Sequence, residues 1–288
     1  DGTNDRTMGY VDVIGSNLIW SPASRRVAYN SRKGIFVAHT PAGEPVKISD
    51  FTPGRSFSWS PGNRILAVKR ITVKNELDVL YNGDIFSIDP DTGEAVNLTD
   101  TQNISESVAV WSPDGRQIAF SAAESTNAMQ ETYSDIWVMD KDRATRKRLT
   151  DTRDSSQWLR GWGGENIWFT THTSDRENYT EWFVDLNGNK REVYRRQSLD
   201  ASAAETFLLS ADGREMVFSQ TEHTLSPSNI NESTLSPSSG VFLVNTEKGL
   251  VRIEECKDIG EKGLLVKTDI HPMQAGAWYD NDVKATEV

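Results

Sequence analysis

The sequence predicts an all-β fold made of repeated four-stranded sheets, and three observations lead to that prediction. A phrase reading Trp-Ser-Pro-Asp-Gly-Arg-Gln-Ile-Ala-Phe at 111–120 recurs, with copies that start near 20, 59, 111, 162 and 209. Further short apolar segments, separated by turn residues, follow each copy. The steps between the copies are 39, 52, 51 and 47 residues, which is the usual length of one four-stranded repeat.

Each phrase predicts two strands joined by a tight turn. An apolar strand ends at the Trp or Leu that opens the phrase. Ser-Pro-Asp-Gly then reverses the chain, because Pro fixes φ, Asp bonds to nearby backbone and Gly accepts a positive φ. The alternating apolar residues that follow, such as Ile118 and Phe120, predict the second strand. The last two copies are weaker, since Gly163-Gly164 replaces Ser-Pro in one and Leu209 replaces Trp in the other.

A third and a fourth strand complete each repeat. The third is predicted over 35–37, 85–88, 136–139, 182–184 and 241–244, and the fourth over 46–48, 96–100 and 148–151. Polar turns such as 89–93 separate them. Four strands per repeat predict a β-propeller, in which radial repetition leaves only short, protected sheet edges.

The expected propeller has six blades, with five or seven as alternatives. Five repeats are recognisable, and residues 255–288 completed by 1–14 supply a sixth of ordinary length. In this arrangement the N-terminal strand at 10–14 pairs with 263–266 and closes the ring. The whole chain, 1–288, is then one domain.

These phrases resemble the TolB-like propeller repeat. Residues 111–152 match it almost throughout, with Trp-Ser-Pro-Asp-Gly-Arg, Asp-Ile-Trp-Val-Met-Asp and Arg-Leu-Thr-Asp in order, and the resemblance covers roughly 20–253. It implies exported binding and interaction proteins, and also the propeller domains that accompany serine peptidases of the prolyl oligopeptidase class. The repeat residues build the scaffold, so the resemblance indicates fold more than function. The peptidase nucleophile motif Gly-x-Ser-x-Gly is absent from the sequence.

Composition and charge exclude several classes of partner. Hydrophobic residues make up 36% of the chain, enough for a real core, and the sequence has no apolar run long enough to predict a transmembrane helix. The net charge of −11 argues against nucleic acid, and we interpret the basic run 143–148 as a solvated turn. The single cysteine, Cys256, excludes an intramolecular disulfide. Because the chain begins with Asp1, we expect a removed leader and a periplasmic or extracellular location.

The connections between second and third strands predict a binding face. They are long in four repeats, at 71–83, 122–134, 171–180 and 220–240, and short at 31–34 in the first. Part of 71–83 alternatively extends its hairpin. The residues expected to bind a partner protein there are Asp78, Tyr81, Glu131, Tyr133, Glu177, Tyr179, His223, Leu225 and Leu235. Segment 224–238 repeats Thr-Leu-Ser-Pro-Ser and is expected to be mobile unless a partner holds it.

The links between blades predict a second candidate site, an axial funnel on the same face. Four tryptophans recur at one repeat position and therefore indicate core packing, whereas Trp158 does not follow that period. A small ligand or glycan would bind in this funnel. A water-filled channel is the alternative interpretation. The funnel residues are Arg55, Arg153, Asp154, Trp158 and Arg160.

No catalytic or metal motif stands out. His172 and His223 follow second strands of adjacent repeats and are interpreted as surface residues. Calcium has a loose match in the acids at 89–91, 140–142 and 280–282, of which turn chemistry explains the first two. We therefore predict a non-enzymatic, exported propeller without a cofactor, acting as a protein-interaction scaffold or a subunit of a larger assembly. A small-ligand or glycan-binding propeller, and a lyase or hydrolase on the same scaffold, are the alternatives.

Overall fold

The computed structural model describes most of the chain between Val13 and Glu255. The described residues form five four-stranded sheets and one two-stranded sheet, all antiparallel. They divide into two compact units, the first running to Asp151 and the second starting at Thr152. The described ranges are 13–39, 43–50, 53–74, 79–101, 104–124, 133–152, 154–172, 178–197, 207–210, 212–220, 223–225, 233–235, 240–245 and 249–255.

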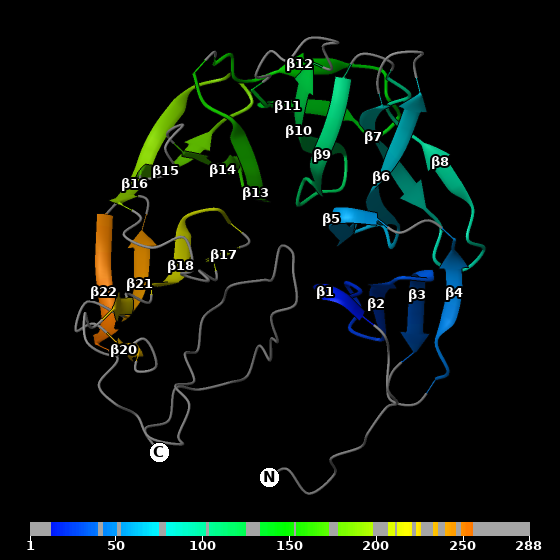
Figure 1. Ribbon diagram of the computed structural model, residues 1–288, viewed down its shortest axis with the longest axis horizontal. Coiled ribbons are helices and arrows are strands. Elements are labelled where there is room, and N and C mark those ends of the chain that lie inside the picture. Colours follow the sequence, from blue (N-terminus) through cyan, green and yellow to red (C-terminus); the bar gives the residue numbers. More distant parts are fainter. Residues whose placement is uncertain are drawn as a thin grey trace, which may run out of the picture. The chain divides into compact units, whose positions relative to one another are not determined.

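The first unit holds three of the four-stranded sheets, called blades one to three in chain order (Figure 1). Blade one consists of β1 (Val13–Trp20), β2 (Arg26–Ser31), β3 (Gly34–His39) and β4 (Val46–Ser49). Blade two consists of β5 (Pro53–Trp59), β6 (Ile65–Lys74), β7 (Val79–Ile88) and β8 (Ala95–Asn97). Blade three consists of β9 (Ile104–Trp111), β10 (Gln117–Glu124), β11 (Asp135–Asp140) and β12 (Arg146–Arg148).

The second unit holds blades four and five and a separate small sheet. Blade four consists of β13 (Gln157–Gly163), β14 (Asn166–His172), β15 (Asn178–Val184) and β16 (Lys190–Gln197). Blade five consists of β17 (Phe207–Leu209), β18 (Glu215–Gln220), β21 (Gly240–Asn245) and β22 (Gly249–Glu255). Between β18 and β21 the chain forms β19 (His223–Leu225) and β20 (Ser233–Leu235). The predicted order of four strands per repeat is therefore confirmed for the five recognisable repeats.

The tight turns between first and second strands follow one pattern in four blades. The N–H of the residue at the fourth turn position donates to the carbonyl of a serine three residues earlier, over 2.8 to 3.0 Å. That residue has a φ between 51° and 69°, and is Ser24, Asn63, Gly115 or Gly213. In blade three, the Ser112 hydroxyl also donates to the Asp114 carboxylate at 2.6 Å. These contacts are the turn chemistry that Ser-Pro-Asp-Gly predicts.

Aromatic pairs recur between second and third strands. In three blades, aromatic residues directly opposite each other stack with ring centroids 5.4 to 6.4 Å apart. Such stacking adds to the energy of simple burial. The pairs are Tyr29 with Phe36, Phe120 with Trp137, and Phe169 with Trp182. Trp137 and Trp182, which occupy equivalent positions on the third strands of blades three and four, therefore serve packing.

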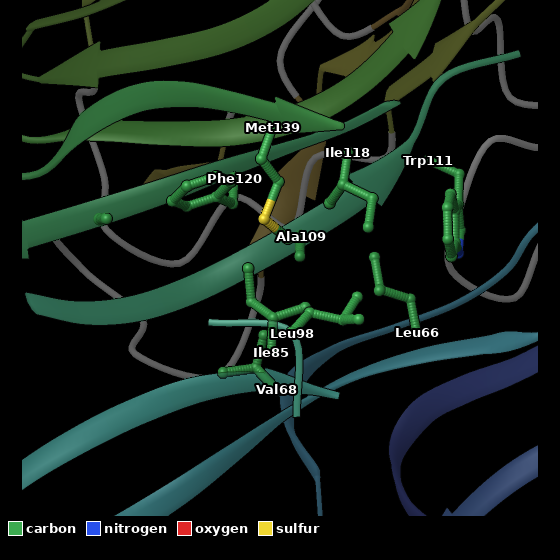
Figure 2. Packing of buried hydrophobic residues seen from close by; sticks show 10 residues of the cluster. Leu66, Val68, Ile85, Leu98, Ala109, Trp111, Ile118, Phe120 and Met139 are labelled. Atoms are coloured by element: carbon green, nitrogen blue, oxygen red, sulfur yellow. The ribbon is translucent and has the colours of Figure 1, made fainter. Parts of the chain in front are cut away.

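The core of the first unit lies between neighbouring blades. Figure 2 shows side chains of blade two, among them Leu66 and Ile85, packed against Ile118 and Phe120 of blade three. A second cluster, including Ile19 and Ile65, joins blades one and two. Each fully buried side chain of this size contributes roughly 1.5–3 kcal/mol. Apolar faces thus hold the three blades of this unit together.

Two features at the ends of the chain lie largely outside the described residues. The expected sixth blade uses 255–288 with 1–14, and the expected closing pair uses 10–14 with 263–266. Of these residues the structure describes Val13, Ile14 and Glu255. Val13 begins β1 and is opposite Ser31 of β2. The six-blade count and the single domain over 1–288 stay predictions.

Candidate functional site

The expected protein-binding residues are distributed over the second and third strands and their connections. Tyr81 lies in β7 opposite Thr72, and Tyr179 lies in β15 opposite His172. Tyr133 lies two residues before the first residue of β11 and is half-buried. His223 and Leu225 lie in β19 and Leu235 in β20, while Asp78, Glu131 and Glu177 are outside the described residues.

The connection at 71–83 is the extended hairpin that the sequence left as an alternative. Strands β6 and β7 have ten residues each, and their pairing continues without a shift from Ile65 opposite Ile88 to Lys74 opposite Val79. Backbone pairing of this length fixes the hairpin by its own hydrogen bonds. The predicted long loop of blade two is therefore mostly sheet.

The two copies of the repeated segment in blade five pair with each other. Thr224 is opposite Thr234, and Leu225 is opposite Ser233. Among the described strands, β19 and β20 form a two-stranded sheet of their own, apart from the order β17-β18-β21-β22 of the blade. We call residues 221–239 the arm. Its described residues, 223–225 and 233–235, pair as a ladder. The expected mobility of 224–238 stays a prediction.

Of the expected funnel residues, the structure brings two together. Trp158 and Arg160 both lie on β13, and the Arg160 guanidinium carbon is 6.0 Å from the centroid of the Trp158 ring. Asp154 is exposed and accepts a hydrogen bond from the Ser155 hydroxyl at 3.2 Å. Arg55 belongs to β5 of the other unit, and Arg153 is outside the described residues.

A hydrogen-bonded chain fixes Arg160. The pairing of β13 with β14 shifts between Leu159 and Gly161, which leaves Arg160 as the extra residue of a bulge. Arg160 Nε donates to Thr170 Oγ1 at 2.8 Å, and Thr170 Oγ1 donates to Glu181 Oε2 at 2.7 Å. Trp168 Nε1 donates to the same carboxylate oxygen at 2.8 Å, deep inside the blade. Arg160 is therefore half-buried, lies over the Trp158 ring, and is held in this orientation by its hydrogen bond to Thr170.

Sequence reasoning missed Thr170 and Glu181. A signal was present, since Glu181 is a charged residue directly before the apolar run of the third strand at 182–184. A fully buried carboxylate needs hydrogen-bond donors, which predicts polar partners on the neighbouring strand. The identity of those partners depends on the register of β14 against β15, where Thr170 is opposite Glu181.

A second buried carboxyl group lies between blades two and three. Glu106 on β9 is 2% exposed, and its side-chain oxygens lie 3.1 and 3.2 Å from Thr101 Oγ1. Burial raises the pKa of Glu106 to about 8, against the smaller opposing effect of hydrogen bonds from Thr101 and from its own backbone N–H. Gly83 on β7 permits the close approach, because a Cβ at that position would be 2.0 Å from the Glu106 carbonyl oxygen.

Two buried aspartates on third strands have structural partners. In blade two, Asp84 accepts hydrogen bonds from Asn97 Nδ2 at 2.8 Å and Thr99 Oγ1 at 3.4 Å. In blade three, Asp135 accepts a hydrogen bond from Thr150 Oγ1 at 3.2 Å and pairs with Arg148. The basic run 143–148 is thus more than a solvated turn, since its Arg148 anchors a buried carboxylate.

The loose calcium candidates form ordinary turns. The Asp89 carboxylate accepts hydrogen bonds from the backbone N–H groups of Asp91 and Thr92, at 2.9 and 3.0 Å. Asp140 accepts hydrogen bonds from Thr145 Oγ1 and from Gln117 Nε2. Within the described ranges, no group of three or more metal-ligating side chains comes together. The third candidate, 280–282, is outside those ranges.

Comparison with known proteins establishes the fold. No protein-family model matches the sequence, and no curated protein matches it. Solved structures do match. An oligogalacturonate lyase in complex with manganese is 11% identical with a TM-score of 0.56, and the match covers 83% of this chain and 64% of the lyase. This chain therefore spans less than two thirds of the lyase's length.

Two further structures connect the chain with TolB-like and peptidase-associated propellers. A putative TolB from Agrobacterium tumefaciens is 18% identical with a TM-score of 0.50, covering 82% of this chain and 79% of that one. The β-propeller domain of the trilobed protease from Pyrococcus furiosus is 13% identical with a TM-score of 0.53, covering 83% and 70%. The predicted β-propeller fold is confirmed. In the described part of the chain, no helix is long and apolar enough to cross a membrane.

Proposed function

We propose that this chain is a protein-binding TolB-like propeller that is exported and contacts its partner through the connections between second and third strands. The observation that carries the proposal is the arm of blade five, whose ends pair as β19 and β20 outside the sheet of the blade. The sequence of the arm has two charged residues beyond its histidine, Glu222 and Glu232. A segment with few charges that pairs outside the sheet of its blade is suited to meet a protein surface.

The backbone of the arm supplies the means of recognition. A two-stranded sheet has unpaired N–H and C=O groups along its outer edges, and a strand of a partner adds to such an edge by main-chain hydrogen bonds. Pairing of Thr224 with Thr234 fixes the hairpin before binding, which lowers the entropy lost on association. Tyr133 and Tyr179, next to the corresponding connections of blades three and four, are the expected side-chain anchors.

The test is reconstitution with the partner captured from the native source and then purified. We expect a stoichiometric complex with the wild-type chain, and at least a tenfold loss of affinity when 221–239 is replaced by a short Gly-Ser linker. The matched control replaces exposed Arg116 and Lys141, which lie on tight turns at the other ends of the strands, by Ala. Hydrogen exchange on the wild-type complex should show new protection at 223–225 and 233–235.

Two outcomes would contradict the proposal. A linker variant that keeps its unfolding midpoint and also keeps full affinity would place the contact elsewhere. Loss of binding in the Arg116→Ala, Lys141→Ala control, with the linker variant unaffected, would assign the contact to the tight-turn face.

The Trp158–Arg160 pair favours a second candidate, a site for an acidic ligand. A guanidinium binds carboxylates through paired hydrogen bonds, and an aromatic ring offers a face to a sugar. The fold likeness to an oligogalacturonate lyase makes oligogalacturonate the first probe. Calorimetry should detect binding that Arg160→Gln removes, and ultraviolet absorbance would detect an unsaturated product if the site also cleaves. Absence of binding at millimolar probe would reject this candidate.

A further inference from the structure

The Thr101 hydroxyl has more oxygen atoms within hydrogen-bond distance than it has protons to donate. Thr101 Oγ1 lies 2.9 Å from the Ile104 carbonyl oxygen and 3.1 and 3.2 Å from the two Glu106 carboxyl oxygens. A threonine hydroxyl has one proton to donate and two lone pairs with which to accept. When that proton goes to the shortest of these contacts, the Ile104 carbonyl, the bond between Thr101 and Glu106 requires its proton from Glu106.

The next blade repeats this arrangement with an amide. The segments 98–101 and 149–152 both read Leu-Thr-Asp-Thr, and Gln157 follows Thr152 by the same five residues that separate Glu106 from Thr101. Gln157 Nε2 donates to Thr152 Oγ1 at 2.7 Å, while Thr152 Oγ1 donates to the Ser155 carbonyl at 3.1 Å. Gln157 is fully buried. In blade four the buried side chain thus donates to the threonine hydroxyl, and a carboxyl group at the equivalent position can do the same only in its neutral form.

The groups around Glu106 leave it little compensation as an anion. Asp84 on β7 disfavours a negative charge there and Arg146 on β12 favours it, the effect of Asp84 being the larger. Asp84 also accepts a hydrogen bond from the Thr101 backbone N–H at 3.3 Å, so Thr101 contacts both carboxyl groups. Lys69 on β6 lies over the Phe86 ring, and Glu124 at the end of β10 is exposed. The other charged residues on strands packed against β9 are Arg55, Arg70 and Lys74.

We propose that Glu106 is a neutral carboxylic acid that donates to Thr101 and so fastens the link between blades two and three, and that its ionisation releases this link. This hydrogen bond makes the stability of the interface between blades two and three depend on pH. Gln157 forms the corresponding hydrogen bond at the start of blade four, and its amide group does not titrate.

The test compares urea unfolding of the wild type, Glu106→Gln and Gln157→Glu from pH 5 to pH 9. Burial raises the Glu106 pKa to about 8, above the value of about 4.3 in an unfolded chain. At a pH between these two values, the folded state therefore binds one proton more than the unfolded state. The unfolding constant of the wild type, relative to that of Glu106→Gln, should rise about tenfold per pH unit across this interval and level off above it. Gln157→Glu should gain a second transition of the same sign.

A direct measurement keeps the proposal testable if a variant fails to fold. In wild-type protein labelled with ¹³C at glutamate carboxyl carbons, one resonance should titrate near pH 8, and the Thr101 amide should exchange faster above that pH. The proposal is overturned if every glutamate carboxyl titrates below pH 6. It is equally overturned if the wild type and Glu106→Gln keep a constant stability difference from pH 5 to pH 9.

Discussion

Single residues decide how tightly neighbouring turns pack. Gly115 has a φ of 68°, and a Cβ at that position would lie 3.3 Å from Cδ of Pro61 in the equivalent turn of blade two. Ser24 and Asn63 occupy the same turn position with φ of 51° and 63°. The left-handed conformation is therefore a property of the turn itself, and glycine is the residue that adopts it with least strain.

Replacing Gly115 by Ala should destabilise the protein by about 1–2 kcal/mol, since the side chain adds left-handed strain and crowds Pro61. Ser24→Gly is the matched control, because it relieves strain at the same position of another blade and should leave stability unchanged or slightly higher. Urea unfolding at constant pH measures both. Equal unfolding midpoints for Gly115→Ala and the wild type would show that the turn absorbs the methyl group.

At the scale of the element, a buried hydroxyl ties the fourth strand to the third. Thr150 Oγ1 accepts the Ile136 backbone N–H at 2.9 Å and donates to Asp135 at 3.2 Å. Blade two has the same arrangement, in which Thr99 Oγ1 accepts the Ile85 N–H at 2.9 Å. The recurring Leu-Thr-Asp thus closes the outer edge of a blade, where the fourth strand has only three residues in each case.

Thr150→Val keeps the shape of the side chain and removes both hydrogen bonds. It should cost about 1–3 kcal/mol, because the Ile136 N–H and Asp135 lose a buried partner. Thr145→Val, which removes an exposed hydroxyl bonded to Asp140, should cost much less. Hydrogen exchange should show faster exchange at Ile136 in Thr150→Val alone. An equal loss of stability in both variants would mean that the buried Thr150 hydroxyl contributes no more than the exposed Thr145 hydroxyl.

At the scale of the whole molecule, aspartates in the turns of both units share a lowered pKa, so acid should destabilise the fold through all of them. Hydrogen bonds from neighbouring side chains and backbone N–H groups hold the pKa of each below its ordinary value. The strongest contribution comes from Ser112 at Asp114 and from Ser210 at Asp212. The full set is Asp50, Asp89, Asp114, Asp140, Asp185 and Asp212.

The unfolding midpoint in urea should therefore fall as the pH drops below about 4. A carboxylate with a lowered folded pKa stabilises the folded state above its unfolded pKa of about 3.9, and that contribution is lost as pH falls through the folded value. Asp114→Asn with Asp212→Asn should weaken this dependence, since two of the titrating groups are removed. A wild-type midpoint that is unchanged between pH 5 and pH 2.5 would contradict the assignment.

Much of the architecture could be predicted from the order of residues. The turn at 112–115 and the strand pair around Phe120 and Trp137 rest on local signals, because proline, glycine and apolar alternation act over a few residues. The candidate site was harder to predict. The sequence predicts Trp158 as an aperiodic tryptophan and Arg160 as a residue of a link between blades, but their contact and the support from Thr170 depend on a bulge in β13.

The sequence by itself determined the five recognisable repeats, their four strands and the turns between them, since each is encoded within one stretch of chain. Only the tertiary structure decided which carboxyl groups are buried and what they meet. Glu106 lies near Asp84 because β9 packs on β7 across two blades, and Glu181 meets Thr170 because of strand register. Interactions between residues distant in sequence depend on geometry that no local pattern specifies.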